Sequence, residues 1–305
     1  MSKSKYEIWM DVIKFQSLSQ AAYYNNYTVP AISQIIKSLE KELGVTLLNR
    51  SHSGVSLTSE GEHLYAYVEK VVQAEAALQE EASKLSGIEG GTIRIGTFSS
   101  ISSHVLVPII RDFKSKHPKI HIELQHGDNL AIETMLSRGI VDLGIVDLPI
   151  SSEFTTYSIL KDPFVAVLPA NHPCAGMERV PLSVFEEYPV VLFNEDTNKE
   201  AAGILRKNRI HANVEYLSSD DPTILSMIEE GMCIGFMGSL ILHKTNYNIV
   251  TRPTEPSIVR EIAFAAKDMA EASPAVHRFL DFALENIRKY TRGFEQPSAR
   301  GAGAR

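Results

Sequence analysis

The chain has 305 residues and a formal net charge of −7, and its shares of apolar (44%) and charged (22%) residues are typical of a soluble globular protein with two or three domains. Its two cysteines, Cys174 and Cys233, are too few for a disulfide framework and too far apart for a CxxC metal pair, so we expect a reducing compartment. The first fifteen residues lack the apolar core and cleavage site of a signal peptide, and the apolar run 225–242 is interrupted by Glu229 and Glu230. The composition predicts a cytoplasmic protein without a membrane span.

Charge is unevenly distributed along the chain. Residues 1–60 contain six Lys/Arg and five Asp/Glu, a net charge of +1, and the remainder has a net charge of −8. A head that is only weakly basic can bind nucleic acid if its few cations are well placed. Charge alone therefore does not predict DNA binding, and the residue pattern has to decide.

Three short helices are predicted at the N-terminus. An apolar stripe indicates the first helix over residues 5–16. Ser19 is a candidate N-cap for a short helix over residues 20–25. Thr28 has the same role for the next helix, and Gly44 is placed to end it.

The last of these helices has two distinct faces. Its apolar side chains fall at helical spacing on one face, namely Ile32, Ile35, Ile36, Leu39 and Leu43. The opposite face carries hydrogen-bonding side chains and no carboxylate before Glu40, as expected of a helix that enters the major groove. Gln34 can bond adenine through two hydrogen bonds, and Lys37 suits a phosphate or a guanine. The alternative is the solvated face of a small helical bundle.

Residues 47–58, "LLNRSHSGVSLT", predict a two-stranded wing that turns at Ser53-Gly54. Arg50 and His52 are then placed near the DNA backbone. The residues predicted to contact DNA are Ser19, Gln20, Thr28, Pro30, Ala31, Ser33, Gln34, Lys37, Arg50 and His52.

The string "SLSQAA…TVPAISQIIKSLEKELGVTLLNRSHSGVSLTSEG" resembles the winged helix-turn-helix of LysR-type transcriptional regulators, with family-like spacing over about sixty residues. The resemblance implies a domain over residues 1–58 that binds double-stranded operator DNA. The chain departs from the family pattern at Thr28-Val29, where Ser-Gln is usual, and at Gln34, where Arg is usual.

A long helix is predicted to follow over residues 59–86. Apolar side chains recur at intervals of seven, which is typical of a coiled-coil seam, at Leu57, Leu64, Val71, Leu78 and Leu85. Thr58 or Ser59 can cap this helix, and Ser59 with Glu62 fits a capping box. A long helix lying on its own domain is the alternative. The family resemblance implies that this linker, residues 59–91 with a hinge at 86–91, pairs subunits into homodimers that assemble as a homotetramer.

Strand-like and helix-like segments alternate from residue 92 onward, which predicts an α/β body with a largely parallel sheet. The strand-like segments are 92–98, 120–126, 141–146, 164–170, 189–193, 233–238 and 260–267, and the helical ones are 103–116, 129–138, 197–208, 221–230 and 274–290. Changes of direction near residues 162 and 267 divide the effector domain, 92–292, into lobe 1 (92–161 and 268–292) and lobe 2 (162–267). Residues 293–305 are predicted to form a disordered tail.

The strings "VDLGIV", "FVAVLPANHP" and "SMIEEGMCIGFMGSLI" resemble the effector domain of the same family, which is similar to periplasmic binding proteins. The expected fold is thus α/β with an N-terminal winged helix-turn-helix, a long linker helix and a two-lobed periplasmic-binding-protein-like effector domain.

A small-molecule effector is expected in the cleft between the lobes, at strand ends and helix N-termini. The side chains predicted to bind it are Ser99, Ser100, Ser102, Asn129, Asp147 and Thr197. Helix capping alone is the other interpretation of the serines. The sequence has no obvious arginine near Asp147, which argues against a strongly anionic effector.

Catalytic and metal motifs are absent from the sequence: there is no GxSxG, no Walker A loop and no HExxH. His121 and His126 are an odd number of residues apart on one strand, so they face opposite sides and do not form a metal pair. We therefore expect no cofactor and no enzyme. A ligand-responsive DNA-binding regulator, with RNA polymerase as a partner if it activates transcription, is favoured over a solute-binding protein or an enzyme.

Overall fold

The computed structural model describes residues 3–51, 54–85, 90–193, 200–270 and 272–294. The chain divides into two units, residues 1–90 with 138–140 and residues 91–137 with 141–305. Each unit is described separately below. Within the described ranges, no helix is long and apolar enough to cross a membrane.

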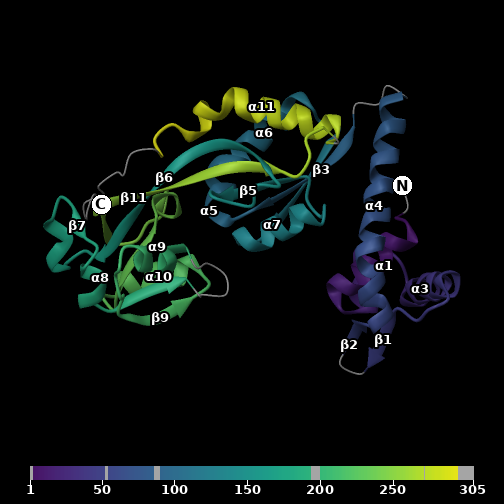
Figure 1. The fold of residues 1–305 in the computed structure, drawn as a ribbon, viewed down its shortest axis with the longest axis horizontal. Helices are drawn as coiled ribbons and strands as arrows, with labels where there is room; N and C mark the ends of the chain where they lie inside the picture. Colours follow the sequence, from purple (N-terminus) through teal and green to yellow (C-terminus); the bar gives the residue numbers. More distant parts are fainter. Residues whose placement is uncertain (1–2, 52–53, 86–89, 194–199, 271, 295–305) are drawn as a thin grey trace. The chain divides into compact units, whose positions relative to one another are not determined.

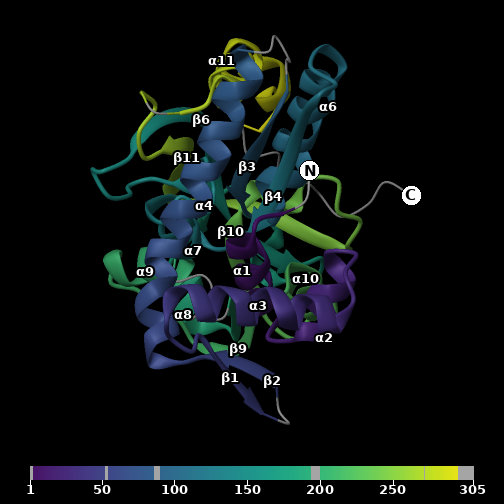
Figure 2. The ribbon, with the colours of Figure 1, turned by 90° about the vertical axis from the view of Figure 1, so that its right-hand side faces the viewer.

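The N-terminal unit contains the predicted three helices and wing (Figure 2). In chain order these are α1 (Lys5–Phe15), α2 (Leu18–Tyr24), α3 (Val29–Leu43), β1 (Leu48–Ser51), β2 (Gly54–Leu57) and α4 (Ser59–Leu85). Thr28 caps α3, and Gly44 ends it in the left-handed conformation, as predicted. The predicted cap of α2 is wrong: Ser17, two residues before Ser19, accepts the hydrogen bond from the backbone N–H of Gln20 at 3.2 Å. The turn predicted at Ser53-Gly54 falls partly outside the described residues.

One hydrophobic core holds these helices together. Trp9, the only tryptophan of the chain, is fully buried in it and meets the ring of Tyr65 on α4 edge-on, with 5.8 Å between the ring centres. Leu57 and Leu64 pack against the same core. The beginning of α4 is therefore part of the DNA-binding unit.

The long helix α4 confirms the predicted helix from Ser59 to Leu85, and the last predicted residue, 86, lies outside the described residues. Thr58 caps it, because its hydroxyl accepts a hydrogen bond from the backbone N–H of Gly61 at 2.9 Å. The capping box predicted for Ser59 is therefore wrong. Gly61 lies so close to Leu47 that a Cβ atom at this position would overlap the Leu47 carbonyl oxygen.

The second unit is built on one mixed sheet with the strand order β4-β3-β5-β11-β6-β10-β8-β9, in which β7 adds to β11. Its strands are β3 (Gly91–Thr97), β4 (Ile120–His126), β5 (Leu143–Asp147), β6 (Thr155–Pro169), β7 (Val180–Pro181), β8 (Val190–Phe193), β9 (Val214–Ser218), β10 (Ile234–Gly238) and β11 (Ile249–Ala266). Its helices are α5 (Ser99–Ile101), a π-helical turn (Ser102–Leu106), α6 (Val107–Lys116), α7 (Asn129–Ser137), α8 (Val184–Glu187), α9 (Glu200–Lys207), α10 (Asp221–Glu229), α11 (Pro274–Thr291) and the 3₁₀ turns Pro173–Gly176 and Ser239–Leu242.

The sheet is less parallel than predicted. Strands β3, β4 and β5 are parallel to one another, as are β8, β9 and β10. Between these two sets run β6 and β11, which are antiparallel to each other and longer than the segments predicted from sequence. Pro253 and Pro256 argue against a central strand in this part of β11, but a shift of register between Pro253 and Ile258 accommodates them.

The two long strands pass from one lobe to the other. In lobe 1, α6 and α11 cover one face of the sheet and α7 covers the other (Figure 1). The packing of β6 changes from lobe 1 to lobe 2 between Leu160 and Phe164, and that of β11 changes between Ile262 and Ile258. The second crossing therefore lies near residue 260, earlier than the expected position near 267, because β11 is one continuous strand.

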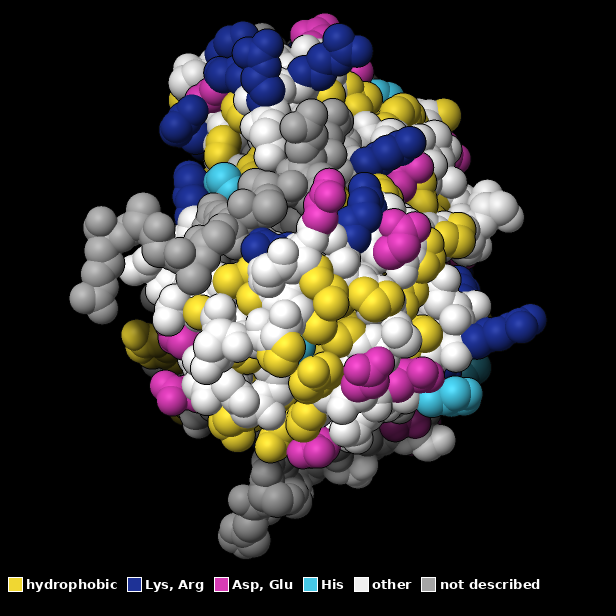
Figure 3. All heavy atoms as spheres, turned by 90° about the vertical axis from the view of Figure 1, so that its left-hand side faces the viewer, with side chains coloured by type: hydrophobic (Ala, Val, Ile, Leu, Met, Phe, Trp, Pro, Cys, Tyr) yellow, Lys and Arg dark blue, Asp and Glu magenta, His cyan; other side chains and the backbone are white. Residues whose placement is uncertain are grey.

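Lobe 2 is layered in the same way, with α8 and α9 on one side of its sheet and α10 on the other. Figure 3 shows a face of the molecule on which hydrophobic side chains gather at the centre and Lys and Arg side chains at the top. The exposed apolar side chains of this lobe include Val214 and Leu217, both on the edge strand β9.

The close approach of Gly61 to Leu47 generates a stability prediction. We expect Gly61→Ala to destabilise the DNA-binding unit by about 1–3 kcal/mol, because backbone must move to admit the methyl group. Urea unfolding followed by the fluorescence of Trp9, which reports this unit alone, measures the effect. The matched control is Gly203→Ala on α9, where an added Cβ meets nothing within 4 Å and the midpoint of the Trp9 transition should stay unchanged. An unchanged midpoint for Gly61→Ala would contradict the argument.

Candidate DNA-binding surface and effector site

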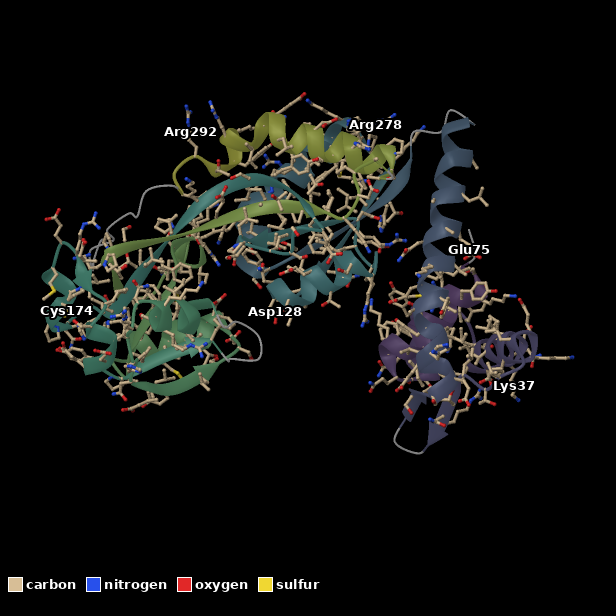
Figure 4. All side chains as sticks on the ribbon, viewed as in Figure 1. Lys37, Glu75, Asp128, Cys174, Arg278 and Arg292 are labelled. Carbon is tan, nitrogen blue, oxygen red and sulfur yellow. The ribbon has the colours of Figure 1, made fainter. Side chains whose placement is uncertain are left out.

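The exposed face of α3 is formed as the sequence predicts. Ile32, Ile36 and Leu39 are buried on its inner face, while Gln34 and Lys37 are exposed on the outer one. Figure 4 shows Lys37 pointing away from the helix. The outer face is free of carboxylates over its first three turns. Groups of this kind suit base edges and phosphates.

The carboxylate of Glu40 is turned toward the start of the wing. It accepts hydrogen bonds from the backbone N–H groups of Leu47 at 2.8 Å and Leu48 at 3.3 Å. These bonds fix the connection from α3 to the first strand of the wing. They also hold the negative charge of Glu40 at the wing, away from the exposed face of α3 that carries Gln34 and Lys37.

Two of the six basic residues among residues 1–60 form ion pairs with carboxylates. Lys3 forms an ion pair with Asp11 at 2.7 Å, and Lys5 forms one with Glu42. Arg50 on β1 donates to the hydroxyl of Ser33 on α3 at 3.0 Å, so these two predicted DNA contacts lie together. Lys37 on α3 and Arg50 beside Ser33 thus provide cations at the candidate base-reading face.

The other predicted DNA contacts lie at the ends of helices. Ser19 and Gln20 are exposed in the first turn of α2. The Thr28 hydroxyl accepts a hydrogen bond from the backbone N–H of Ala31 at 3.3 Å, and Pro30 occupies the first turn of α3. His52 lies outside the described residues.

The heptad positions of α4 differ in their surroundings. The first two, Leu57 and Leu64, pack into the DNA-binding unit. Val71 and Leu78 are 39% and 72% exposed. The side chain of Leu85 lies outside the described part of the structure. The predicted seam therefore has two exposed apolar positions that no side chain of the described chain covers.

Arg260 is the centre of a buried charge network between the lobes. Its Nε and Nη2 atoms lie 2.8 and 2.7 Å from Asp162 Oδ2, and the Asp162 side chain is fully buried. The second oxygen of Asp162 accepts hydrogen bonds from the Ser239 hydroxyl at 2.8 Å and from the Leu240 N–H at 3.0 Å. The guanidinium also lies 5.5 Å from the ring centre of Phe98. The ion pair joins β11, β6 and the turn after β10.

Asp147, a predicted effector contact, belongs to the same network. Its carboxylate lies 3.2 Å from Arg260 Nη1. The Asn129 side chain donates to the Asp147 carbonyl at 2.9 Å and accepts from its N–H at 2.7 Å. The expectation that no arginine lies near Asp147 is therefore wrong. Arg260 is distant in sequence, but the antiparallel pairing of β11 with β5 brings it to this position.

The predicted serines have different surroundings. Ser99 is exposed, and its hydroxyl lies 2.8 Å from Nε2 of His126 at the end of β4. Ser100 is buried. The Ser102 hydroxyl donates to the Phe98 carbonyl at 2.9 Å and so is used within the helix. The predicted contact Thr197 lies outside the described residues.

Asp221, at the N-terminus of α10, faces this region from lobe 2. Burial, and then the charge of Asp220, raise its pKa to about 6, whereas Arg260 and His126 act in the opposite direction. Its Oδ1 atom is buried and, within the described chain, has no hydrogen-bond donor. The Oδ1 atom of Asp147 is likewise buried and has no hydrogen-bond donor within the described chain. Lobe 1 and lobe 2 thus each contribute a carboxylate to the surroundings of Arg260.

Sequence reasoning missed Arg260, Asp162 and Asp221. The sequence carried a detectable signal for Arg260. Alternate residues of a strand face the same side, so Arg260 is expected on the same face as the apolar Ile262 and Phe264. A charged residue at such a buried position needs a partner. A small cavity of about 20 Å³ adjoins Arg260 in lobe 2, which is space for about one water molecule. Its other lining residues include Phe164, Phe193, Phe236, Met237 and Gly238.

The two cysteines are buried in separate hydrophobic clusters and are not brought together. Burial raises the pKa of both thiols, that of Cys233 to about 11. Thiols with a raised pKa carry little of the reactive thiolate near neutral pH. These side chains belong to the packing of lobe 2.

Two family models together match nearly the whole chain. "Bacterial regulatory helix-turn-helix protein, lysR family" matches residues 5–62, and "LysR substrate binding domain" matches residues 86–288. The HTH-type transcriptional regulator YvbU of Bacillus subtilis is 26% identical over 93% of this chain and 98% of that protein. The "Probable HTH-type transcriptional regulator LrrA" of Synechococcus elongatus is 28% identical over 92% and 96%.

The fold is also similar to that of a solved protein–DNA complex. Full-length CbnR in complex with its target DNA matches with a TM-score of 0.66 at 16% identity, over 93% of this chain and 98% of that one. At this level of identity the match supports the fold alone.

The buried ion pair predicts a large effect of a single substitution. Arg260→Met should destabilise the second unit by about 3–5 kcal/mol, because it leaves the fully buried Asp162 without its cationic partner. The matched control is Arg179→Met, whose ion pair with Glu255 at 3.7 Å is exposed on both sides and should contribute less than about 1 kcal/mol. Thermal unfolding followed by circular dichroism compares the two. Equal losses in the two variants would contradict a structural role for the buried pair.

The raised pKa of Asp221 predicts a pH dependence with a definite sign. Because this pKa is near 6 in the folded protein and near 3.8 when unfolded, the charged carboxylate destabilises the fold above pH 6. Asp221→Asn should therefore be more stable than wild type at pH 7.5. The advantage should decrease as the pH falls from 6 to 4, where wild type becomes protonated, and unfolding in urea at several pH values measures it. A constant difference across this window would show that Asp221 does not titrate as inferred.

Proposed function

The chain belongs to the LysR family of bacterial transcriptional regulators, and from this premise we propose how its two units divide the work. It is a regulator with a helix-turn-helix DNA-binding domain and a substrate-binding domain. The first unit binds operator DNA through α3 and the wing. The second binds a small-molecule effector between its lobes, and this binding modulates the affinity for DNA.

One observation supports the DNA-binding role best. The exposed face of α3 offers Ser33, Gln34 and Lys37, while the nearest carboxylate, Glu40, is held by backbone N–H groups of the wing. Base edges in the major groove are contacted by hydrogen-bond donors and acceptors, and the neighbouring phosphates disfavour an unpaired negative charge. The exposed face of α3 meets both requirements. We assign Gln34 to base contact and Lys37 and Arg50 to phosphates.

The effector is proposed to bind near the Arg260 network. Ser99, His126 and Asn129 approach it from lobe 1, and Asp221 approaches it from lobe 2. A ligand that touches both lobes can bind one arrangement of the lobes better than another, which is the condition for shifting the equilibrium between them. Three carboxylates, those of Asp147, Asp162 and Asp221, face a single arginine, so hydrogen-bond donors on the ligand are favoured over a second anion.

Assembly is the third part of the proposal. Val71 and Leu78 lie seven residues apart on α4 and are exposed, as a helix that pairs with a second copy requires. We propose a homodimer through α4 and a homotetramer on DNA, acting in the cytoplasm and contacting RNA polymerase where the regulator activates transcription. We assign no catalytic reaction to the chain.

A DNA-binding measurement with the full-length protein tests the proposal. Gln34→Ala should lose about 1–3 kcal/mol of discrimination at one base position, because one bidentate contact is removed. Lys37→Ala should instead weaken binding to all sequences and make the affinity less dependent on salt. Selection from random DNA, followed by affinity measurement at several salt concentrations, separates the two effects.

The matched control is Lys207→Ala, which removes an exposed cation of α9 in the second unit and should change neither property. A full-length protein that enriches no sequence from the random pool would contradict the proposed regulator. An unchanged base preference for Gln34→Ala would contradict only the role of that side chain.

A further inference from the structure

The first turn of α3 has an unusual chemical character for a helix that reads DNA. Its residues are Val29, Pro30 and Ala31, none of which has a side-chain hydrogen-bond donor or acceptor. Val29 is 40% exposed, so its methyl groups face outward from the helix end. In helix-turn-helix proteins, the N-terminal residues of the second helix are the ones that contact base edges. This end of α3 therefore presents apolar groups where polar contacts are usual.

The polar side chains on either side are engaged as hydrogen-bond acceptors within the protein, and each hydroxyl keeps its own proton to donate. The Thr28 hydroxyl oxygen accepts the capping hydrogen bond from the backbone N–H of Ala31 at 3.3 Å. Ser33 lies one turn further along, and its hydroxyl oxygen accepts a hydrogen bond from Arg50 at 3.0 Å. The side chains of the first turn itself are apolar, so a base edge that lies against Val29 meets a methyl-bearing surface.

Only one base offers an apolar group to that surface. In the major groove, guanine, cytosine and adenine present hydrogen-bond donors and acceptors, whereas thymine also presents its C5-methyl group. A polar base edge against Val29 would lose its water without gaining a hydrogen bond, which is unfavourable. A thymine methyl group in the same place buries apolar surface against apolar surface.

We propose that Val29 determines part of the operator sequence by contacting the C5-methyl group of a thymine in each half-site. This inference rests on the proposed function, because it assumes that α3 enters the major groove. The contact is to the methyl group and not to the pairing edge of the base. A 5-methylcytosine at the same position presents the same group and is therefore bound better than cytosine.

Replacement of single thymines by uracil isolates the methyl group, since uracil forms the same base pair and lacks only that group. Full-length protein first selects its sites from random DNA, and each thymine of the selected site is then replaced in turn. We expect one thymine per half-site at which uracil weakens binding about fourfold, the effect of removing one buried methyl group. Cytosine and 5-methylcytosine at that position should differ by a similar factor, with the methylated base bound more tightly.

Val29→Ala should weaken binding to the thymine site and abolish the difference between thymine and uracil at that one position. The matched control is Leu43→Ala, which shortens an apolar side chain of similar exposure, 37%, at the other end of the same helix and should keep the difference. The fluorescence of the buried Trp9 verifies that both variants are folded.

Three results would overturn the inference. A selected site in which no thymine responds to uracil excludes methyl recognition, while the regulator itself stands. A difference between thymine and uracil that persists in Val29→Ala assigns the contact to another side chain. If the full-length protein selects no sequence at all, the proposed regulator fails, and this inference fails with it.

Discussion

The second unit of this regulator depends on the ion pair between Arg260 and Asp162. Both side chains are removed from water, and such burial is tolerated only when each charge has a partner and the remaining hydrogen-bonding groups are satisfied. The second oxygen of Asp162 is held by the turn that follows β10. Gly238 makes this arrangement possible, since a Cβ atom there would lie 2.5 Å from the Asp162 carboxylate and 2.6 Å from the guanidinium. The pair therefore fixes the place at which the two long strands cross between lobes.

The same charges give the region between the lobes its chemistry. Asp147 shares Arg260 with Asp162, and its backbone is held on both sides by the Asn129 side chain. Asp221 approaches from lobe 2 with a raised pKa, because burial and the charge of Asp220 outweigh the attraction of Arg260. A buried carboxylate oxygen without a hydrogen bond is unfavourable. A ligand that donates hydrogen bonds to these carboxylates would therefore bind more tightly the fewer hydrogen bonds they accept in its absence. The proposed effector site and the connection between the lobes thus share the same side chains.

The DNA-binding unit reaches its function with very little net charge. Two of the six basic residues among residues 1–60, Lys3 and Lys5, form ion pairs within the unit. The strength of non-specific binding follows the number of phosphates contacted, so a head whose net charge is only +1 is expected to obtain more of its affinity from base edges. The close approach of Gly61 to Leu47 and the burial of Trp9 against α4 hold the reading helix at a fixed position within the unit. Rigid placement matters here, because base contacts are short-ranged.

The sequence by itself determined the elements that local signals specify. The caps at Thr28 and Gly44, the apolar stripe of α3 and the heptad spacing of α4 each depend on residues close in the chain, and the structure forms these helices at the predicted positions. The long strand β11 was predicted too short, because Pro253 and Pro256 act locally against a strand, whereas pairing with β6 on one side and β7 on the other stabilises one. Only the tertiary structure decided that Arg260 meets Asp147 and Asp162, which precede it by 113 and 98 residues. Sheet register alone brings charges so distant in sequence together, and no local pattern of residues encodes that register.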